Sequence, residues 1–150
     1  MIFVSDLDAA LDAAIAKRTA EPVTETVEVL VGDEVWFLRF EEMYSGTWAD
    51  ICASSPIRVD APLDRNYGYN FTVATEKAAP LSGVRLVDGV AETLTSEQWS
   101  KLFAVLSGHD RSSVQDAIFK LNEFDPAQRL ARAKKALRVA SKQKRPSHVS

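Results

Sequence analysis

The run over residues 23–40 constrains the fold most, because apolar and polar side chains alternate in it on both sides of a Gly32-Asp33 pair. A period of two residues is that of a β-strand, and a two-residue turn containing glycine is typical of a β-hairpin. Trp36, Leu38 and Phe40 share one face of the returning strand. We therefore predict a hairpin whose apolar face packs on a core.

Helical spacing is found on both sides of this hairpin. Ser5 is a candidate N-cap for a first helix, whose apolar stripe includes Leu7, Leu11 and Ile15 and which ends before Pro22. The next expected elements are a helix opened by residues 45–48 and stopped by Pro56, a loop over 55–66, a helix from Tyr67 ended by Pro80 and Gly83, and a second hairpin over 84–94 with Asp88-Gly89 at its tip.

Two capping-box patterns predict the following pair of helices. Thr95 and Gln98 fit the first capping box, and after a loop at 109–111, Ser112 and Gln115 fit the second. Two helices joined by a short connection are expected to pack antiparallel. The sequence thus predicts a helix-rich α+β single domain with two β-hairpins and a basic amphipathic C-terminal helix.

Charge divides the chain into two parts. Residues 1–124 carry 10 Lys or Arg and 20 Asp or Glu, whereas residues 125–150 carry 8 Lys or Arg and one acidic residue, Asp125. The resulting net charges of −10 and +7 make up the −3 of the whole chain. We predict an acidic compact α+β domain over 1–124, then a basic helix opened by Asp125-Pro126 and a disordered tail over 143–150.

The predicted last helix has a narrow apolar side and a basic side. Leu130 and Leu137 are the only large residues of the apolar side, so this side buries little area and either docks weakly or waits for a partner. The basic side, called the basic arm below, consists of Arg132, Lys135, Arg138, Lys142 and Arg145. Such an arm could follow phosphates, but it has no interleaved aromatic residues and the acidic domain would repel a polyanion.

No residue pattern typical of catalysis is found. The six glycines form no phosphate-binding loop, and no serine nucleophile elbow is present. One cysteine, Cys52, and two separated histidines, His109 and His148, make no zinc pattern, although a spatial pairing of Cys52 with His109 stays open. We therefore expect no enzymatic activity, no cofactor and no metal. With neither a signal peptide nor a transmembrane run, we expect a cytoplasmic protein without a membrane partner.

Two apolar clusters each have a structural and a functional interpretation. The aromatic cluster over residues 67–71 could stack bases or peptide, but seating a helix on the core is the simpler interpretation. The apolar stripe of the helix over 96–107 consists of Trp99, Leu102, Phe103 and Leu106. This stripe could line a groove for an amphipathic client, although core packing is again the simpler interpretation.

Six segments follow one another in a characteristic order. They are Val27–Phe40, a helix opened by Trp48, Arg65–Asn70, Ala79–Arg85, Leu94–Trp99 with Leu102-Phe103, and Ala117–Asn122, before a lysine-rich end. In this joint order the sequence resembles the tail assembly chaperones of long-tailed bacteriophages, especially those that infect actinobacteria. The resemblance covers roughly residues 23–138 and carries no catalytic signature.

The resemblance implies a defined task. These chaperones bind the tape measure protein, a very long, helix-rich and aggregation-prone chain, and keep it soluble until tail tube subunits polymerise around it. They are commonly made in two forms, the longer one by a programmed ribosomal frameshift. The chain would then be the short form, working in the host cytoplasm and absent from the mature virion. Its partners would be the tape measure protein, the longer form and further copies of itself, with the tail tube protein as a further candidate.

A contact surface and two other functions complete the expectations. We expect the stripe of the 96–107 helix, partly uncovered, and the Leu130 and Leu137 side of the last helix to contact the client. The first alternative is a tail-completion or connector subunit that stays in the virion. The second is a small nucleic-acid-binding protein that uses the basic arm.

Overall fold

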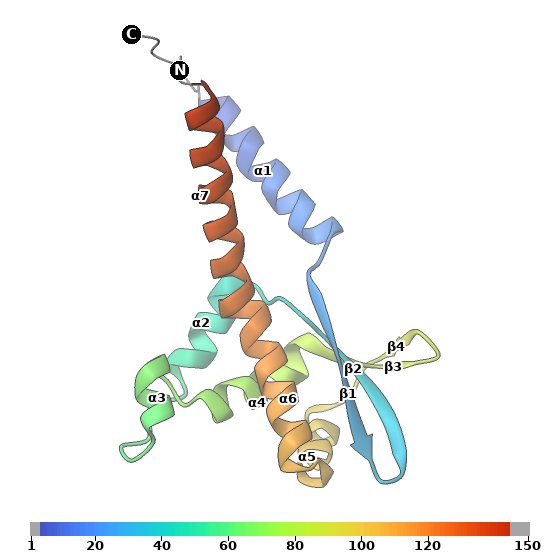
Figure 1. Cartoon of the computed structure of the whole chain (residues 1–150). Helices are drawn as coiled ribbons and strands as arrows, with labels where there is room; N and C mark the ends of the chain where they lie inside the picture. Colours follow the sequence, from blue (N-terminus) through green and yellow to red (C-terminus); the bar gives the residue numbers. More distant parts are fainter. Residues whose placement is uncertain (1–3, 145–150) are drawn as a thin grey trace.

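The computed structural model describes residues 4–144, which form one four-stranded antiparallel sheet and a set of surrounding helices (Figure 1). The elements are α1 (Val4–Ala20), β1 (Thr24–Val31), β2 (Glu34–Glu41), α2 (Ser45–Ala53), α3 (Pro62–Tyr67), α4 (Phe71–Ser82), β3 (Gly83–Val87), β4 (Val90–Glu92), α5 (Ser96–Val105), α6 (Gly108–Phe119), the π-helical turn η1 (Lys120–Phe124) and α7 (Asp125–Lys144). The predicted helix-rich α+β fold, with two hairpins and a long C-terminal helix, is confirmed.

The hairpin of β1 and β2 forms as the alternation predicts. Val31 lies opposite Glu34, and Gly32 between them has a positive φ of 62°, which glycine adopts without the steric cost of a Cβ. Leu38 and Phe40 are fully buried, whereas Val35 on the other face is exposed. One face of this hairpin therefore contributes to the core and the other faces outward.

The second hairpin is also confirmed, and it joins the first. Asp88 and Gly89 both have positive φ, 51° and 78°, as a type I′ turn requires. The strand β3 pairs antiparallel with β2, with Gly83 opposite Phe40, so the strand order is β1-β2-β3-β4. The sequence predicted the two hairpins but not their union in one sheet.

The core lies between the inner face of the sheet and the helices α2, α4, α5 and α6. Trp99 of α5 is almost fully buried, and its ring lies 5.7 Å from that of Phe40 on β2. Val114 and Ile118 on α6 are fully buried as well, and α6 packs against both α4 and β1. These helices and the sheet form the body of the molecule.

Two boundaries before α4 differ from the expectation. The segment expected as a loop over 55–66 contains most of the helix α3, which begins with Pro62 and has the buried Asp64 in its first turn. Pro at a first helical position needs no N–H there, which is why a Pro-containing segment still forms a turn of helix. The following helix begins at Phe71 rather than Tyr67, because the Asn70 side chain caps it by accepting a bond from the Val73 N–H.

The prediction for the helices α5 and α6 is correct in part. The capping box of Thr95 and Gln98 forms, but the one expected at Ser112 and Gln115 is wrong. Ser107 caps α6 instead, so the expected loop at 109–111 is the first turn of the helix. With only two extended residues between the helices, the chain turns a corner, and α6 packs on α4 and β1 rather than antiparallel to α5.

The last two helices are continuous through a π-helical turn. Lys120 and Asp125, at the two ends of η1, both have helical backbone angles. The helix α7 begins at Asp125 as predicted, yet Asp125 continues the preceding helix rather than breaking from it. The first helix, α1, likewise includes Ser5 instead of starting after it. The predicted disordered tail over 143–150 is wrong at residues 143–144, which are the last two of α7, and its remainder lies outside the described residues.

Candidate functional site

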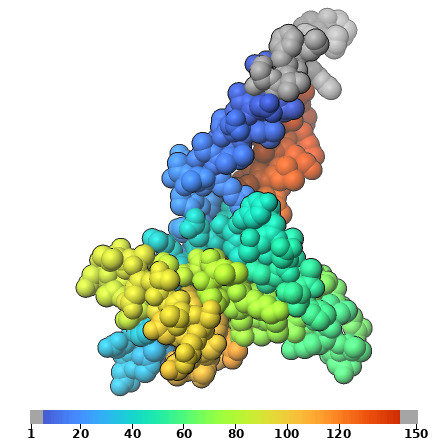
Figure 2. Space-filling view, turned by 180° about the vertical axis from the view of Figure 1, so that it is seen from behind, coloured from blue at the N-terminus to red at the C-terminus, as the bar shows by residue number. Residues whose placement is uncertain are grey.

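Two helices project from the body and form what we call the stalk. The stalk consists of α1 and α7, which leave the body on the same side and run in opposite chain directions (Figure 1). The space-filling view shows α1 rising from the body with α7 behind it (Figure 2). Neither helix is covered by another element along its length.

Large apolar side chains of the stalk are open to solvent. We call these five residues the stalk apolar surface: Leu7, Leu11 and Ile15 on α1, and Leu130 and Leu137 on α7, with exposures of 51%, 55%, 65%, 58% and 71%. At the base of α1 a hollow of about 570 Å³ continues this surface towards Val23 and Tyr44. Exposed large apolar side chains grouped on neighbouring elements are a feature of interaction sites.

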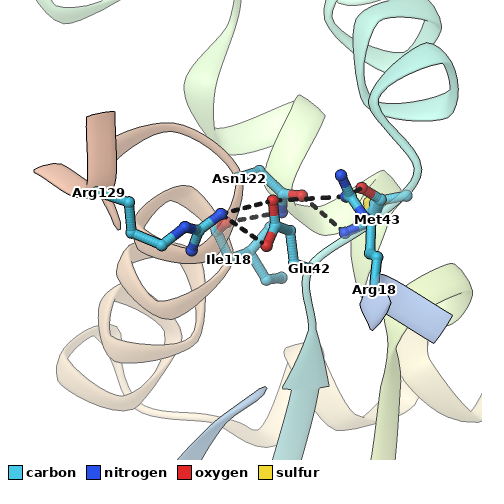
Figure 3. A network of polar contacts seen from close by, with 6 residues as sticks. All are labelled: Arg18, Glu42, Met43, Ile118, Asn122 and Arg129. Carbon is cyan, nitrogen blue, oxygen red and sulfur yellow. Dashed lines mark hydrogen bonds and ion pairs between the residues drawn. The ribbon is translucent and has the colours of Figure 1, made fainter. Parts of the chain in front are cut away.

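A carboxylate at the end of β2 holds both stalk helices at their base (Figure 3). Arg129 Nη2 of α7 donates to both Glu42 carboxylate oxygens at 3.1 and 3.0 Å, and Arg18 Nη2 of α1 lies 3.4 Å from Glu42 Oε1. The same Arg18 nitrogen donates to the Met43 carbonyl at 2.6 Å. Glu42 is therefore the shared anchor of α1 and α7.

The π-helical turn contributes a second set of anchors. Asn122 Oδ1 accepts from the Met43 N–H at 2.9 Å, and its Nδ2 donates to the Ile118 carbonyl at 2.9 Å. Glu123 Oε1 accepts from Trp48 Nε1 at 2.7 Å. Sequence reasoning missed Glu42, Asn122 and Glu123, because no local pattern shows that a π-helical turn will bring Asn122 to Met43 and Glu123 to Trp48.

The apolar stripe of α1 is turned towards this anchor, and the stripe of α7 lies to one side of it. Leu7 and Leu11 precede Arg18 by eleven and seven residues, which places them within about 20° of its direction on an α-helix. On α7, Leu137 and Leu130 lie about 80–100° to one side of Arg129. Arg18 and Arg129 both reach Glu42, so the α1 stripe faces the side on which Glu42 lies, whereas the α7 stripe lies about a quarter turn from the direction of Glu42.

The two stalk helices carry opposite charges. Asp6, Asp8 and Asp12 on α1 are exposed, and in the part of the chain that the structure describes they form no ion pair. Four residues of the basic arm, Arg132, Lys135, Arg138 and Lys142, are exposed on α7 and likewise unpaired within residues 4–144. The fifth, Arg145, lies outside the described residues. The stalk therefore presents an acidic helix beside a basic one.

The predicted client stripe on α5 is not part of this surface. Trp99, Leu102, Phe103 and Leu106 are all buried in the core of the body. The expectation that this stripe is partly uncovered is wrong, because the sheet and α4 cover the face that the periodicity identified. Core packing, the simpler interpretation, is confirmed.

The aromatic cluster is also part of the core. Tyr67 stacks on Phe71 with ring centres 4.9 Å apart, and Phe119 of α6 packs edge-on against both rings. Tyr69 is buried beside Trp48, with ring centres 6.0 Å apart. These contacts therefore pack the end of α3 and the start of α4 against α6, as the simpler interpretation predicts.

The open pairing of Cys52 with His109 does not form. Cys52 on α2 lies beside Tyr69 and Glu123, where burial above all, and then the Glu123 charge, raise the pKa of its thiol to about 11. His109 is exposed in the first turn of α6, rather than in the loop expected at 109–111, and its Nδ1 lies 3.2 Å from Asp110 Oδ1. Asp110 in turn accepts from the Leu30 N–H at 3.0 Å.

The described residues contain neither a group of metal ligands nor a helix suited to crossing a membrane. Within residues 4–144 no three His, Cys, Asp or Glu side chains are grouped so as to hold a metal ion. None of the helices in that range is at once long and apolar enough to cross a membrane.

The chain matches no family model, no characterised protein and no solved structure at a significant level.

Proposed function

We propose that this protein is a tail assembly chaperone of a long-tailed bacteriophage, which binds the tape measure protein and keeps it soluble while the tail tube assembles. The observation that supports it best is the stalk apolar surface, whose five large side chains are each more than half exposed. A chaperone of this kind works by mass action, covering apolar surface of its client that would otherwise self-associate. No bond-making step is needed.

Leu130 and Leu137 are the proposed client contacts. They are the large apolar residues of a long exposed helix, and a helix-rich client offers amphipathic segments that could lie along such a face. Because the face has few large residues, it buries little apolar area and binds the client weakly. The client can therefore be released when tube subunits arrive. The basic arm would add charge-dependent attraction to acidic stretches of the client.

Further features of the proposal follow from the resemblance alone. The chain would be the short form of a frameshift pair, would act in the host cytoplasm and would be absent from finished particles. The parent DNA tests this directly. A slippery heptamer near the last codons, an overlapping reading frame and a very long downstream gene are the expected features.

Co-expression tests the client contact. The tape measure protein encoded beside this chain should be soluble with the wild-type chain and insoluble with the Leu130→Asp, Leu137→Asp double variant. Val139→Asp is the matched control, since Val139 lies nine residues after Leu130 and so on the opposite side of α7. Circular dichroism verifies that each variant folds. Soluble client with the double variant would show that the assigned contact surface is wrong.

The exposed basic arm supports one other candidate, a nucleic-acid-binding protein. Its four described side chains lie on one extended helix and are free to follow phosphates. A titration with duplex DNA at two salt concentrations distinguishes this function, because such binding weakens steeply as salt rises. A third candidate, a permanent connector subunit, predicts stoichiometric recovery of the chain in mass analysis of purified particles.

A further inference from the structure

The stalk leaves both of its helices without tertiary cover. Helices in proteins gain most of their stability by packing an apolar face rather than from intrinsic propensity. Yet α1 is joined to the body by little beyond Arg18, and all five members of the stalk apolar surface remain more than half exposed. The two helices of one chain therefore do not cover each other's apolar residues.

We infer that a second copy of this chain covers the stalk, with α1 of each copy packed against α7 of the other. The arrangement is a two-fold symmetric, antiparallel four-helix bundle. In such an isologous interface the contact of α1 with the partner's α7 is made twice. The inference goes beyond the proposed function, because it concerns the chain before a client binds. The second copy covers Leu130 and Leu137 until the client takes its place on α7.

Charge identifies the occupant. Asp8 and Asp12 lie about 60° and 100° from Leu11 around α1, and Lys134 and Arg138 lie about 40° and 80° from Leu130 around α7. Beyond the last turn of α1, which holds Lys17 and Arg18 at the base, the charges beside each apolar stripe are therefore of one sign, acidic on α1 and basic on α7. A nucleic acid would be repelled by α1, and an acidic helix would suit only α7. A second copy supplies the opposite sign to both helices at once.

The dimensions of the two helices also suit a bundle. α1 has 17 residues and α7 has 20, which correspond to lengths of about 26 and 30 Å. Helices of matched length that run in opposite directions are the usual components of a four-helix bundle. Ala14 on α1 and Ala133 on α7 lie in the stripes and would allow close approach of the helices.

The oligomeric state of the purified, reduced protein tests the inference. Size-exclusion chromatography with light scattering should give twice the 16.5 kDa chain mass at about 100 μM, and Leu11→Asp or Leu137→Asp should each give the monomer. Val139→Asp, on the far side of α7, should stay dimeric. A monomeric wild-type protein, or a dimer that persists in both leucine variants, would overturn the inference.

A charge exchange tests the pairing itself. The Asp8→Lys, Asp12→Lys variant has two basic stalk helices, and the Lys134→Glu, Arg138→Glu variant has α1 acidic and α7 much less basic. Each variant alone should dissociate at least tenfold more readily than the wild type, while an equal mixture should form a heterodimer. Failure of the mixture to associate would contradict a pairing between chains.

The outcome is separate from that of the proposed function. The Leu7→Asp, Leu11→Asp variant should be monomeric because α1 is altered, yet it retains Leu130 and Leu137 for the client. If it still solubilises the tape measure protein, the dimer and the client contact are distinct properties. If the wild type is monomeric but solubilises the client, the inference fails and the proposed function stands.

Discussion

At the scale of single residues, a buried carboxylate fixes the segment between α2 and α4. Asp64 is fully buried, and its Oδ2 accepts from the Arg58 backbone N–H at 2.9 Å and from Arg58 Nε at 3.0 Å, while Oδ1 accepts from Nη2 at 3.1 Å. A buried charge is tolerated when its hydrogen bonds are satisfied in this way. The Arg58 guanidinium holds the pKa of Asp64 below its ordinary value.

Asp64→Asn should therefore lower stability at neutral pH. A carboxyl whose pKa is lowered by folding contributes stability above its ordinary pKa and loses that contribution as pH falls through the lowered value. The difference in urea midpoint between wild type and variant should be large at pH 7 and should narrow below pH 4. Asp60→Asn, at an exposed neighbouring position, should leave the midpoint unchanged at both pH values. A pH-independent difference would contradict the charge-based explanation.

The thiol of Cys52 provides a second residue-scale prediction. Its pKa is raised from 9.0 to about 11, chiefly by burial and secondarily by Glu123. Because the thiolate is the reactive form, alkylation of the folded protein should remain slow at pH 9 and accelerate towards pH 11. The same measurement in urea should give the ordinary thiol value. An inflection near 9 in the folded protein would show that the environment of Cys52 is not as described.

At the scale of elements, the junction of α4 and β3 depends on close packing. A Cβ at Gly83 would lie 2.6 Å from Phe40 Cε1 and 2.9 Å from the Ala79 carbonyl oxygen, so any side chain there displaces the ring or the backbone. Because β3 pairs with β2 at this point, the junction also determines how the second hairpin joins the sheet.

Gly83→Ala should destabilise the protein by about 1–3 kcal/mol, the usual cost of overpacking. Gly108→Ala is the matched control, since no atom lies within 4 Å of its added Cβ and the residue begins α6. That control should be neutral or stabilising by about 0.5–1 kcal/mol, because alanine favours helix. Thermal and urea unfolding measure both. Equal effects at the two glycines would contradict the role given to Phe40.

At the scale of the whole molecule, the body and the stalk are stabilised differently. The body has one continuous core between sheet and helices, whereas the stalk helices are fixed mainly at their base by Glu42, Arg18 and Arg129. Regions with few buried contacts open locally without global unfolding. We therefore expect the stalk to open more readily than the body.

Glu42→Gln should reveal this difference. Hydrogen bonds to charged groups contribute about 1.5–3 kcal/mol, and since Arg18 and Arg129 are about half exposed we expect a loss of about 1–2 kcal/mol. Amide exchange along α1 should accelerate about 5–30-fold, while amides of β2 and α6 away from residue 42 should be little changed. Glu41→Gln, at an exposed position, should leave α1 unaffected. Uniform acceleration would mean that stalk and body open together.

The sequence by itself determined the elements whose cause is local. Alternation with a glycine turn produced both hairpins, and the Thr95 capping box produced α5, because turn and cap chemistry act within a few residues. The apolar stripes on α1, α5 and α7 were also readable from spacing. What the spacing could not tell is whether a stripe is covered.

Only the tertiary structure decided that the α5 stripe is buried while those of α1 and α7 are open. Burial depends on which other elements come to lie on a face, and those elements are distant in sequence. The same reason explains why Glu42, Asn122 and Glu123 were missed as anchors and why the two hairpins were not expected to share one sheet. The residues and strands that they contact lie many residues away in the sequence, so no local pattern predicts these contacts.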